Sequence, residues 1–112
     1  MAALLRGEIY WTDLDPTQGR EQSGRRPVLI VSENVFNARS DTAIVVALTS
    51  EVPRAGFPLT LEIVGTGLPK RSWVKISHIR TISTQRLGSR VGEATSQELV
   101  MVLEGLNEIL GG

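Results

Sequence analysis

The sequence predicts one mainly β domain, residues 1–112, in which a curled and mostly antiparallel sheet is covered by a C-terminal helix. Two patterns predict this fold class. Between residues 7 and 82, short apolar or alternating segments are separated by clusters of turn-forming residues, which is typical of small antiparallel sheets. From residue 95 onward the apolar side chains recur at helical spacing instead. A chain of 112 residues suits one domain.

The first predicted strand covers residues 7–14, where apolar and polar side chains alternate. The next two, residues 27–32 and Thr42–Thr49, are continuous apolar runs, so both faces of each strand are expected to be buried. Residues 33–41 between them are rich in Asn and Ser and are predicted as a turn. Further strands are predicted at residues 59–64 and 72–76, with a short sixth at residues 79–82.

Residues 13–25 are predicted as a long loop because Asp, Pro, Gly, Gln and Ser dominate the segment. Loops of this length are uncommon in compact domains unless they serve a function, often as lids over a binding site. The loop leads into the sequence RRPVLIV, in which Arg25 and Arg26 stand in front of a buried strand. Two positive charges at the mouth of such a strand indicate a site for an anion.

Residues 95–112 are predicted to form the C-terminal helix. The segment TSQE is a capping box, in which the Thr95 hydroxyl accepts from the Glu98 amide and the Glu98 carboxylate accepts from the Thr95 amide. Gly111 is placed to end the helix in a left-handed conformation. Gly105 costs about 1 kcal/mol relative to Ala in a helix interior, which indicates close packing there. The apolar side chains at helical spacing are Leu99, Val102, Leu103, Leu106 and Leu110.

Composition and charge exclude several classes of protein. The chain has no cysteine, which excludes disulfides and thiolate metal sites and suits the cytoplasm. No run of about 18 apolar residues predicts a membrane span. Residues 70–90 carry six bases and no acid, whereas residues 93–112 carry four acids and no base. The middle of the chain is therefore a candidate for binding a polyanion such as a nucleic acid, and the tail is not.

Arg26 is a candidate for binding phosphate. The proline that follows favours an extended backbone at Arg26, and a guanidinium held at a strand edge can bind a phosphate through two hydrogen bonds. The alternative is a structural arginine that pairs with Asp13 or Glu21. Thr49 ends a predicted strand, where its hydroxyl either faces a site or binds its own turn. His78 is the only histidine, which excludes a His-rich metal site. No metal ion or cofactor is predicted.

Four blocks follow one another along the chain: RGEIYWTDLDP, GREQSGRRPVLIV, ALTS and HIRTISTQRL. Together they resemble the MazF/PemK family of toxins, and the resemblance extends from Arg6 to about Leu110. It implies an SH3-like β-barrel with a C-terminal helix, working as a homodimer in the bacterial cytoplasm. It also implies sequence-specific, metal-independent cleavage of single-stranded RNA, and a small MazE-like antitoxin whose acidic tail blocks the RNA groove.

The resemblance also implies roles for individual residues. It places the catalytic arginine at Arg26 and the catalytic threonine at Thr49. It implies attack by the RNA 2′-hydroxyl, which leaves a 2′,3′-cyclic phosphate and a 5′-hydroxyl. Ser77 and His78 stand where many relatives carry an acid and a glutamine that contact RNA, so a different cleavage sequence is expected. The implied RNA-binding residues are Glu21, Gln22, Arg25, Asn37, Ser77, His78, Arg80 and Arg86.

Two other functions are compatible with the same fold class. A CcdB-like toxin binds DNA gyrase without cutting nucleic acid, but it uses an exposed tryptophan near its C-terminus, and this chain ends in the sequence ILGG. A generic SH3-like binding module needs neither Arg26 nor Thr49. The nuclease is therefore the leading hypothesis, and the gyrase-binding toxin is the alternative.

Overall fold

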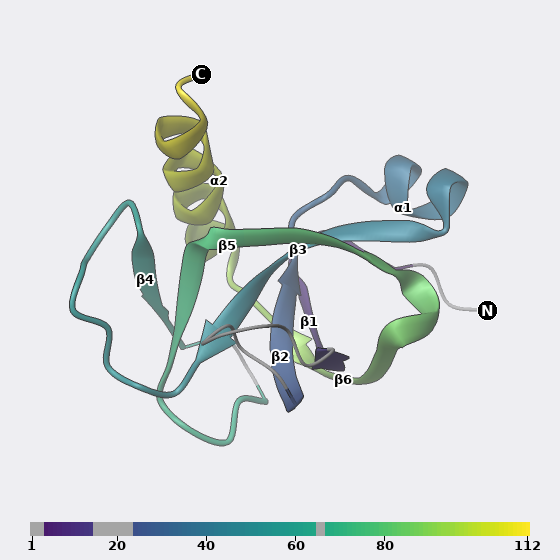
Figure 1. The fold of residues 1–112 in the computed structure, drawn as a ribbon, viewed down its shortest axis with the longest axis horizontal. Coiled ribbons are helices and arrows are strands. Elements are labelled where there is room, and N and C mark those ends of the chain that lie inside the picture. The colour runs from purple at the N-terminus through teal and green to yellow at the C-terminus, as the bar shows by residue number, and fades with distance from the viewer. Residues whose placement is uncertain (1–3, 15–23, 65–66) are drawn as a thin grey trace.

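The computed structural model of the protein describes residues 4–14, 24–64 and 67–112 (Figure 1). In these residues six antiparallel strands form one curled, open sheet with the order β4-β5-β3-β2-β1-β6. The predicted mainly β fold with a C-terminal helix is confirmed. The strands are β1 (Glu8–Leu14), β2 (Gly24–Ile30), β3 (Thr42–Thr49), β4 (Thr60–Ile63), β5 (Ser72–Ser83) and β6 (Leu87–Glu93). The helices are α1 (Asn34–Ser40), the 3₁₀ helix η1 (Thr84–Arg86) and α2 (Ser96–Leu110).

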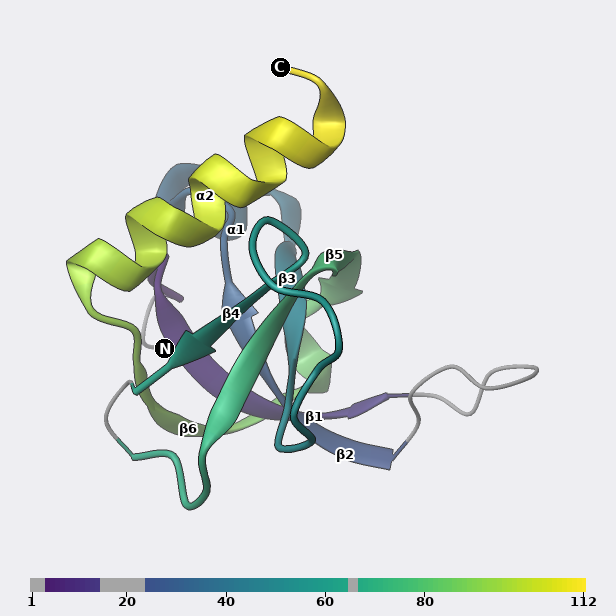
Figure 2. The ribbon, with the colours of Figure 1, turned by 90° about the vertical axis from the view of Figure 1, so that its left-hand side faces the viewer.

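Strands β2 and β3 lie at the centre of the sheet and bury side chains on both faces, as their continuous apolar runs predicted. On one face, Leu29 pairs with Val46, and both belong to a core that includes Val102 of α2. On the other face, Val28 and Val45 belong to a second core. Helix α2 covers one face of the sheet only (Figure 2). The other face has its own apolar centre and is not covered by α2.

The predicted end of the chain is confirmed in detail. The Glu98 amide donates to the Thr95 hydroxyl at 3.1 Å, and the Thr95 amide donates to the Glu98 carboxylate at 2.9 Å. These are the two hydrogen bonds of a capping box. Gly111 ends α2 with a φ of 78°, in the left-handed region that favours glycine.

The turn predicted at residues 33–41 is wrong, because helix α1 occupies most of that segment. The helix is held by Asn37, which is 4% exposed. Its amide nitrogen donates to the carbonyl oxygens of Leu4 and Ser32 at 3.3 Å each, and the Ser32 hydroxyl donates to its amide oxygen. Asp41 ends the helix with a φ of 57°. Hydrogen bonds to other segments stabilise this helix, so the composition of residues 33–41 does not predict it.

Strand β5 is one strand of 12 residues rather than the two short strands predicted. Val46 pairs with Ile79 and Ala47 pairs with Lys75, so residues 76–78 have no partner on β3 and form a bulge. Bulges bend a strand, and β5 bends sharply along its length in Figure 1. The polar residues of the bulge explain why the sequence pattern predicts a break there.

Strand β6 was not predicted, because its glycines and charged residues have low strand propensity. It forms by pairing with β1, and the register of that pair shifts twice. The loop predicted at residues 13–25 is wrong at both ends, since β1 continues through Leu14 and β2 begins at Gly24. The remainder of that loop lies outside the described residues.

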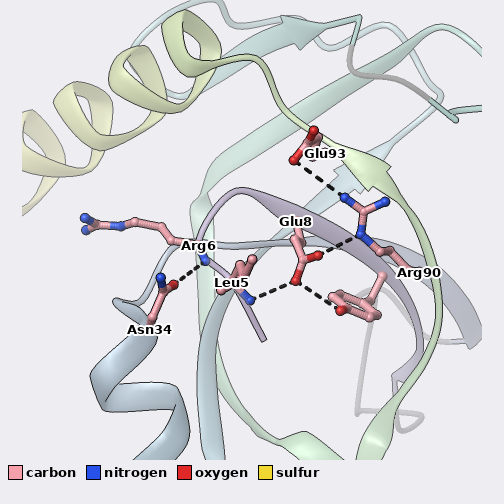
Figure 3. A network of polar contacts seen from close by, with 7 residues as sticks. Leu5, Arg6, Glu8, Asn34, Arg90 and Glu93 are labelled. Carbon is pink, nitrogen blue, oxygen red and sulfur yellow. Dashed lines mark hydrogen bonds and ion pairs between the residues drawn. The ribbon is translucent and has the colours of Figure 1, made fainter. Parts of the chain in front are cut away.

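The carboxylate of Glu8 ties three segments together (Figure 3). It accepts hydrogen bonds from the Leu5 amide at 2.8 Å, from Arg90 Nε on β6 at 2.7 Å and from the Tyr10 hydroxyl at 3.1 Å. Arg90 also lies 3.5 Å from the carboxylate of Glu93. Burial raises the pKa of the Glu8 carboxyl, but these hydrogen bonds outweigh burial and hold that pKa below its ordinary value.

Gly105 allows α2 to approach the sheet closely. A side-chain carbon at this position would lie 2.8 Å from Ile76 Cδ1 and 3.1 Å from the carbonyl oxygen of Pro58. Ile76 is fully buried, so it has little room to move away. The close packing inferred from the sequence is therefore confirmed.

We expect Gly105→Ala to lower the free energy of unfolding by about 1 kcal/mol, because overpacking costs about 1–3 kcal/mol and exceeds the gain in helix propensity of about 1 kcal/mol. Urea unfolding followed by circular dichroism measures the change. The matched control is Gly56→Ala, whose new carbon meets no atom within 4 Å, and which should stay within about 0.5 kcal/mol of the wild type. A variant at position 105 that is more stable than the wild type would contradict the packing argument.

We expect Glu8→Gln to lower the free energy of unfolding at neutral pH by about 1.5–3 kcal/mol, the usual contribution of hydrogen bonds to a charged group. A carboxyl whose pKa is depressed on folding stabilises the protein above its unfolded pKa, about 4.5, and loses that contribution as the pH falls through the folded pKa. The stability difference between the two proteins should therefore shrink as the pH falls below about 4.5. Urea unfolding from pH 3 to 7 measures it, with exposed Glu93→Gln as the control. A difference that does not change with pH would overturn the assignment.

Candidate active site

Arg26 and Thr49 lie on the same face of the sheet, at the same end of two neighbouring strands. Val28 of β2 pairs with Ala47 of β3, and paired residues share a face. Because side chains alternate along a strand, Arg26 shares the face of Val28, and Thr49 shares the face of Ala47. The pairs between β2 and β3 end at Val28 and Ala47, so Arg26 and Thr49 each lie two residues beyond the last pair, at the same end of the two strands. This face is the one that α2 does not cover.

The hydroxyl of Thr49 is positioned by its own turn. It accepts a hydrogen bond from the Glu51 amide at 3.2 Å, which is the structural alternative considered for this residue. A hydroxyl has one proton to donate and two lone pairs, so this contact leaves the proton of Thr49 available to a ligand. The residue is 7% exposed. The turn contact and a role toward a ligand are therefore compatible.

Arg26 is half-buried in β2 and pairs with Thr12 of β1. Ion pairs between described residues engage Arg6, Arg71 and Arg90, and not Arg26. The pairing with Asp13 considered from the sequence is thus not formed. The other possible partner, Glu21, lies outside the described residues.

Two more cations lie on this face of the sheet. Arg80 pairs with Val45 and Lys75 pairs with Ala47, so both side chains share the face of Arg26 and Thr49. Both residues are half-buried, and neither forms an ion pair with another described residue. Sequence reasoning singled out Arg80 but not Lys75. Side chains alternate between the two faces along the strand predicted at residues 72–76. Lys75 therefore shares the face of Trp73, and this pattern could have identified Lys75 from the sequence.

Ser77 and His78 lie in the bulge of β5 and are exposed. The bulge sits between the pairs that place Lys75 and Arg80 on the site face. Bulges often redirect side chains next to active sites. The two residues expected to influence the cleavage sequence are therefore close in the chain to the cations of this face.

Three other predicted residues make contacts within the fold. Arg25 points to the opposite face of β2, where its guanidinium lies 5.0 Å from the ring centre of Trp11. Asn37 is buried, and its amide is used inside the fold. Arg86 ends η1 and donates to the carbonyl oxygen of Asp13 at 2.6 Å. Each of these side chains has a structural contact that explains its presence.

Glu21 and Gln22, the other predicted RNA-binding residues, lie outside the described residues. Among residues 4–14, 24–64 and 67–112, no three His, Asp or Glu side chains gather in a way that could hold a metal ion. No helix in these ranges is long and apolar enough to cross a membrane. On this face the Thr49 hydroxyl and the cations Arg26, Lys75 and Arg80 form a set of donors that suits a phosphate diester.

Comparison with known proteins points to one family. Residues 5–110 match the model of the PemK-like, MazF-like toxin of type II toxin-antitoxin systems. The chain is 37% identical over 105 residues to endoribonuclease EndoA of Bacillus subtilis, covering 92% of this chain and 90% of the relative. It is 35% identical over 110 residues to endoribonuclease MazF of Staphylococcus epidermidis, covering 96% and 92% of the two chains.

Solved structures agree with this match. A mycobacterial endoribonuclease in complex with its cognate antitoxin superimposes with a TM-score of 0.80 at 30% identity, covering 97% of this chain and 96% of the other. MazF from Deinococcus radiodurans superimposes with a TM-score of 0.83 at 25% identity, and the match covers 100% of both chains. The barrel-like fold expected from the sequence is thus confirmed.

Proposed function

The chain belongs to the PemK-like and MazF-like toxins of type II toxin-antitoxin systems, and from that premise we propose that it cleaves single-stranded RNA at specific sequences without a metal ion. The observation that carries this proposal is the placement of Arg26 and Thr49 at the same end and on the same face of neighbouring strands. Relatives that are 35–37% identical over most of the chain are named endoribonucleases. Those names favour the nuclease over the gyrase-binding alternative.

RNA carries its own nucleophile, and the protein has to orient and stabilise the reaction. The 2′-oxygen attacks the neighbouring phosphorus, its proton passes to water, and the bond from phosphorus to the 5′-oxygen breaks. The products are a 2′,3′-cyclic phosphate and a 5′-hydroxyl. Deoxyribose has no 2′-hydroxyl, so DNA is not a substrate.

Arg26 stabilises the negative charge that develops on the phosphate in the transition state, and it donates a proton toward the leaving 5′-oxygen. A guanidinium is a poor base because its pKa exceeds about 12, so Arg26 does not take the proton of the 2′-hydroxyl. Thr49 donates its hydroxyl proton to a non-bridging oxygen of the same phosphate. The Glu51 amide holds the Thr49 oxygen in place for that contact.

Lys75 and Arg80 extend the positive face along β5 and bind neighbouring phosphates of the RNA strand. Ser77 and His78, in the bulge between them, contact bases. Because they replace the acid and glutamine typical of relatives, the preferred sequence differs from those of such relatives. Glu21, Gln22, Arg25 and Arg86 are further candidates for RNA contacts, whereas the amide of Asn37 is buried and used within the fold.

The partners follow from the same proposal. A mycobacterial structural relative is an endoribonuclease in complex with its cognate antitoxin, which supports an acidic, MazE-like antitoxin for this chain. The protein would act as a homodimer in the bacterial cytoplasm, where mRNA is available, and its activity would slow translation and growth.

We expect Arg26→Ala to lower kcat/KM for RNA cleavage by about 10²–10³-fold, the usual loss when a preorganised donor to a developing charge is removed. Thr49→Val should lose about tenfold, because it removes one hydrogen bond to the phosphate while keeping the shape. The assay is cleavage of a fluorescent RNA that contains the preferred sequence. Arg39→Ala, an exposed arginine on α1, is the control and should cut at the wild-type rate. Full activity of Arg26→Ala would contradict the proposed site.

A further inference from the structure

A hollow of about 440 Å³ is lined by β4, by Trp73 at the start of β5 and by the loop that joins β3 to β4. Thr49 pairs with Trp73 of β5, and Trp73 pairs with Glu62 of β4. Paired residues share a face, so these three side chains form a row on the face that carries Arg26. Both Trp73 and Glu62 line the hollow. The hollow therefore continues the candidate active site by two strands, β5 and β4.

The walls of the hollow combine apolar side chains with one carboxylate. Phe57 and Val52 line it and are 41% and 72% exposed, which leaves apolar surface open to a ligand. The carboxylate of Glu62 accepts from Arg71 Nε at 2.5 Å and from Arg71 Nη2 at 3.1 Å. Since each carboxylate oxygen has two acceptor positions, Glu62 keeps capacity for a further donor. These hydrogen bonds hold the pKa of Glu62 below its ordinary value.

The hollow is also built rigidly. The guanidinium carbon of Arg71 lies 5.0 Å from the ring centre of Trp73, so one arginine holds both the indole and the carboxylate in position. The Thr60 hydroxyl donates to the Ala55 carbonyl oxygen at 2.5 Å, and the Leu59 amide donates to the Gly56 carbonyl oxygen at 3.0 Å. A site shaped before the ligand arrives loses less affinity on binding.

We propose that this hollow binds the base of a nucleotide next to the phosphate that is cut, and that Glu62 selects a base with an amino group. The inference rests on the proposed ribonuclease function. Neighbouring strands are about 4.8 Å apart, so Glu62, two strands from Thr49, lies about 10 Å away, which is within the reach of a base whose phosphate lies at Thr49. Unpaired RNA bases stack on aromatic side chains and are read at their hydrogen-bonding edges. A carboxylate accepts from the amino groups of cytosine, adenine or guanine, whereas uracil has none.

The test uses cleavage of an RNA library randomised around the cut, with every new 5′ end mapped by sequencing. We expect the wild type to prefer an amino-bearing base at one position beside the cut. Glu62→Gln should reduce that preference at least fivefold, because one such base contact contributes a factor of about five or more. Arg71→Gln removes the group that positions Glu62 but keeps the carboxylate, so it should lower kcat/KM while keeping the preference for an amino-bearing base.

Phe57→Ala provides a second variant that leaves the ion pair intact. It should lower kcat/KM about fivefold or more, because stacking on an aromatic ring is lost. Thermal unfolding confirms that each variant is folded. Discrete cuts by the wild type with an unchanged profile in Glu62→Gln and an unchanged rate in Phe57→Ala would overturn the inference and leave a peptide of the antitoxin as the occupant. The absence of any cut by the wild type would instead overturn the proposed function.

Discussion

The pairing of β2 with β3 is the constraint on which the rest of the structure depends. Both strands bury both faces, so a shift of the register by one residue would move every buried side chain to the wrong core. The same pairing decides where the two strands end and which side their last residues face. Arg26 precedes the apolar run of β2, and Thr49 ends the apolar run of β3. The register of the two strands therefore also sets the positions of these two residues. The position of the candidate site is thus a consequence of core packing rather than of separate contacts.

Much of this arrangement could be predicted from the sequence. Continuous apolar runs identified the two central strands, and the capping box identified the start of the C-terminal helix. Local patterns failed where other segments supply the stabilising contacts. Helix α1 depends on the buried amide of Asn37, and β6 depends on pairing with β1 and on the bond from Arg90 to Glu8. Neither contact leaves a periodic signal in its own segment.

The candidate site was partly predictable for the same reason. Arg26 and Thr49 could be found because each ends a recognisable strand within a family motif. The run of bases at residues 70–90 suggested a nucleic acid, but the structure divides it: Arg71 and Arg90 form ion pairs, whereas Lys75 and Arg80, on the face of Arg26, form none with a described residue. Charge alone cannot make that division, because it depends on the register of β5 and its bulge. The same register places the buried Trp73 opposite Thr49.

The central claim is that this face cuts RNA through the 2′-hydroxyl without a metal ion. The most direct measurement incubates the purified protein with a long, weakly structured RNA in excess EDTA, then maps the new ends and identifies their chemistry. The account predicts cuts at one short sequence, each leaving a 5′-hydroxyl and a 2′,3′-cyclic phosphate. RNA that stays intact at high protein concentration, or fragments that carry 5′-phosphates, would contradict it.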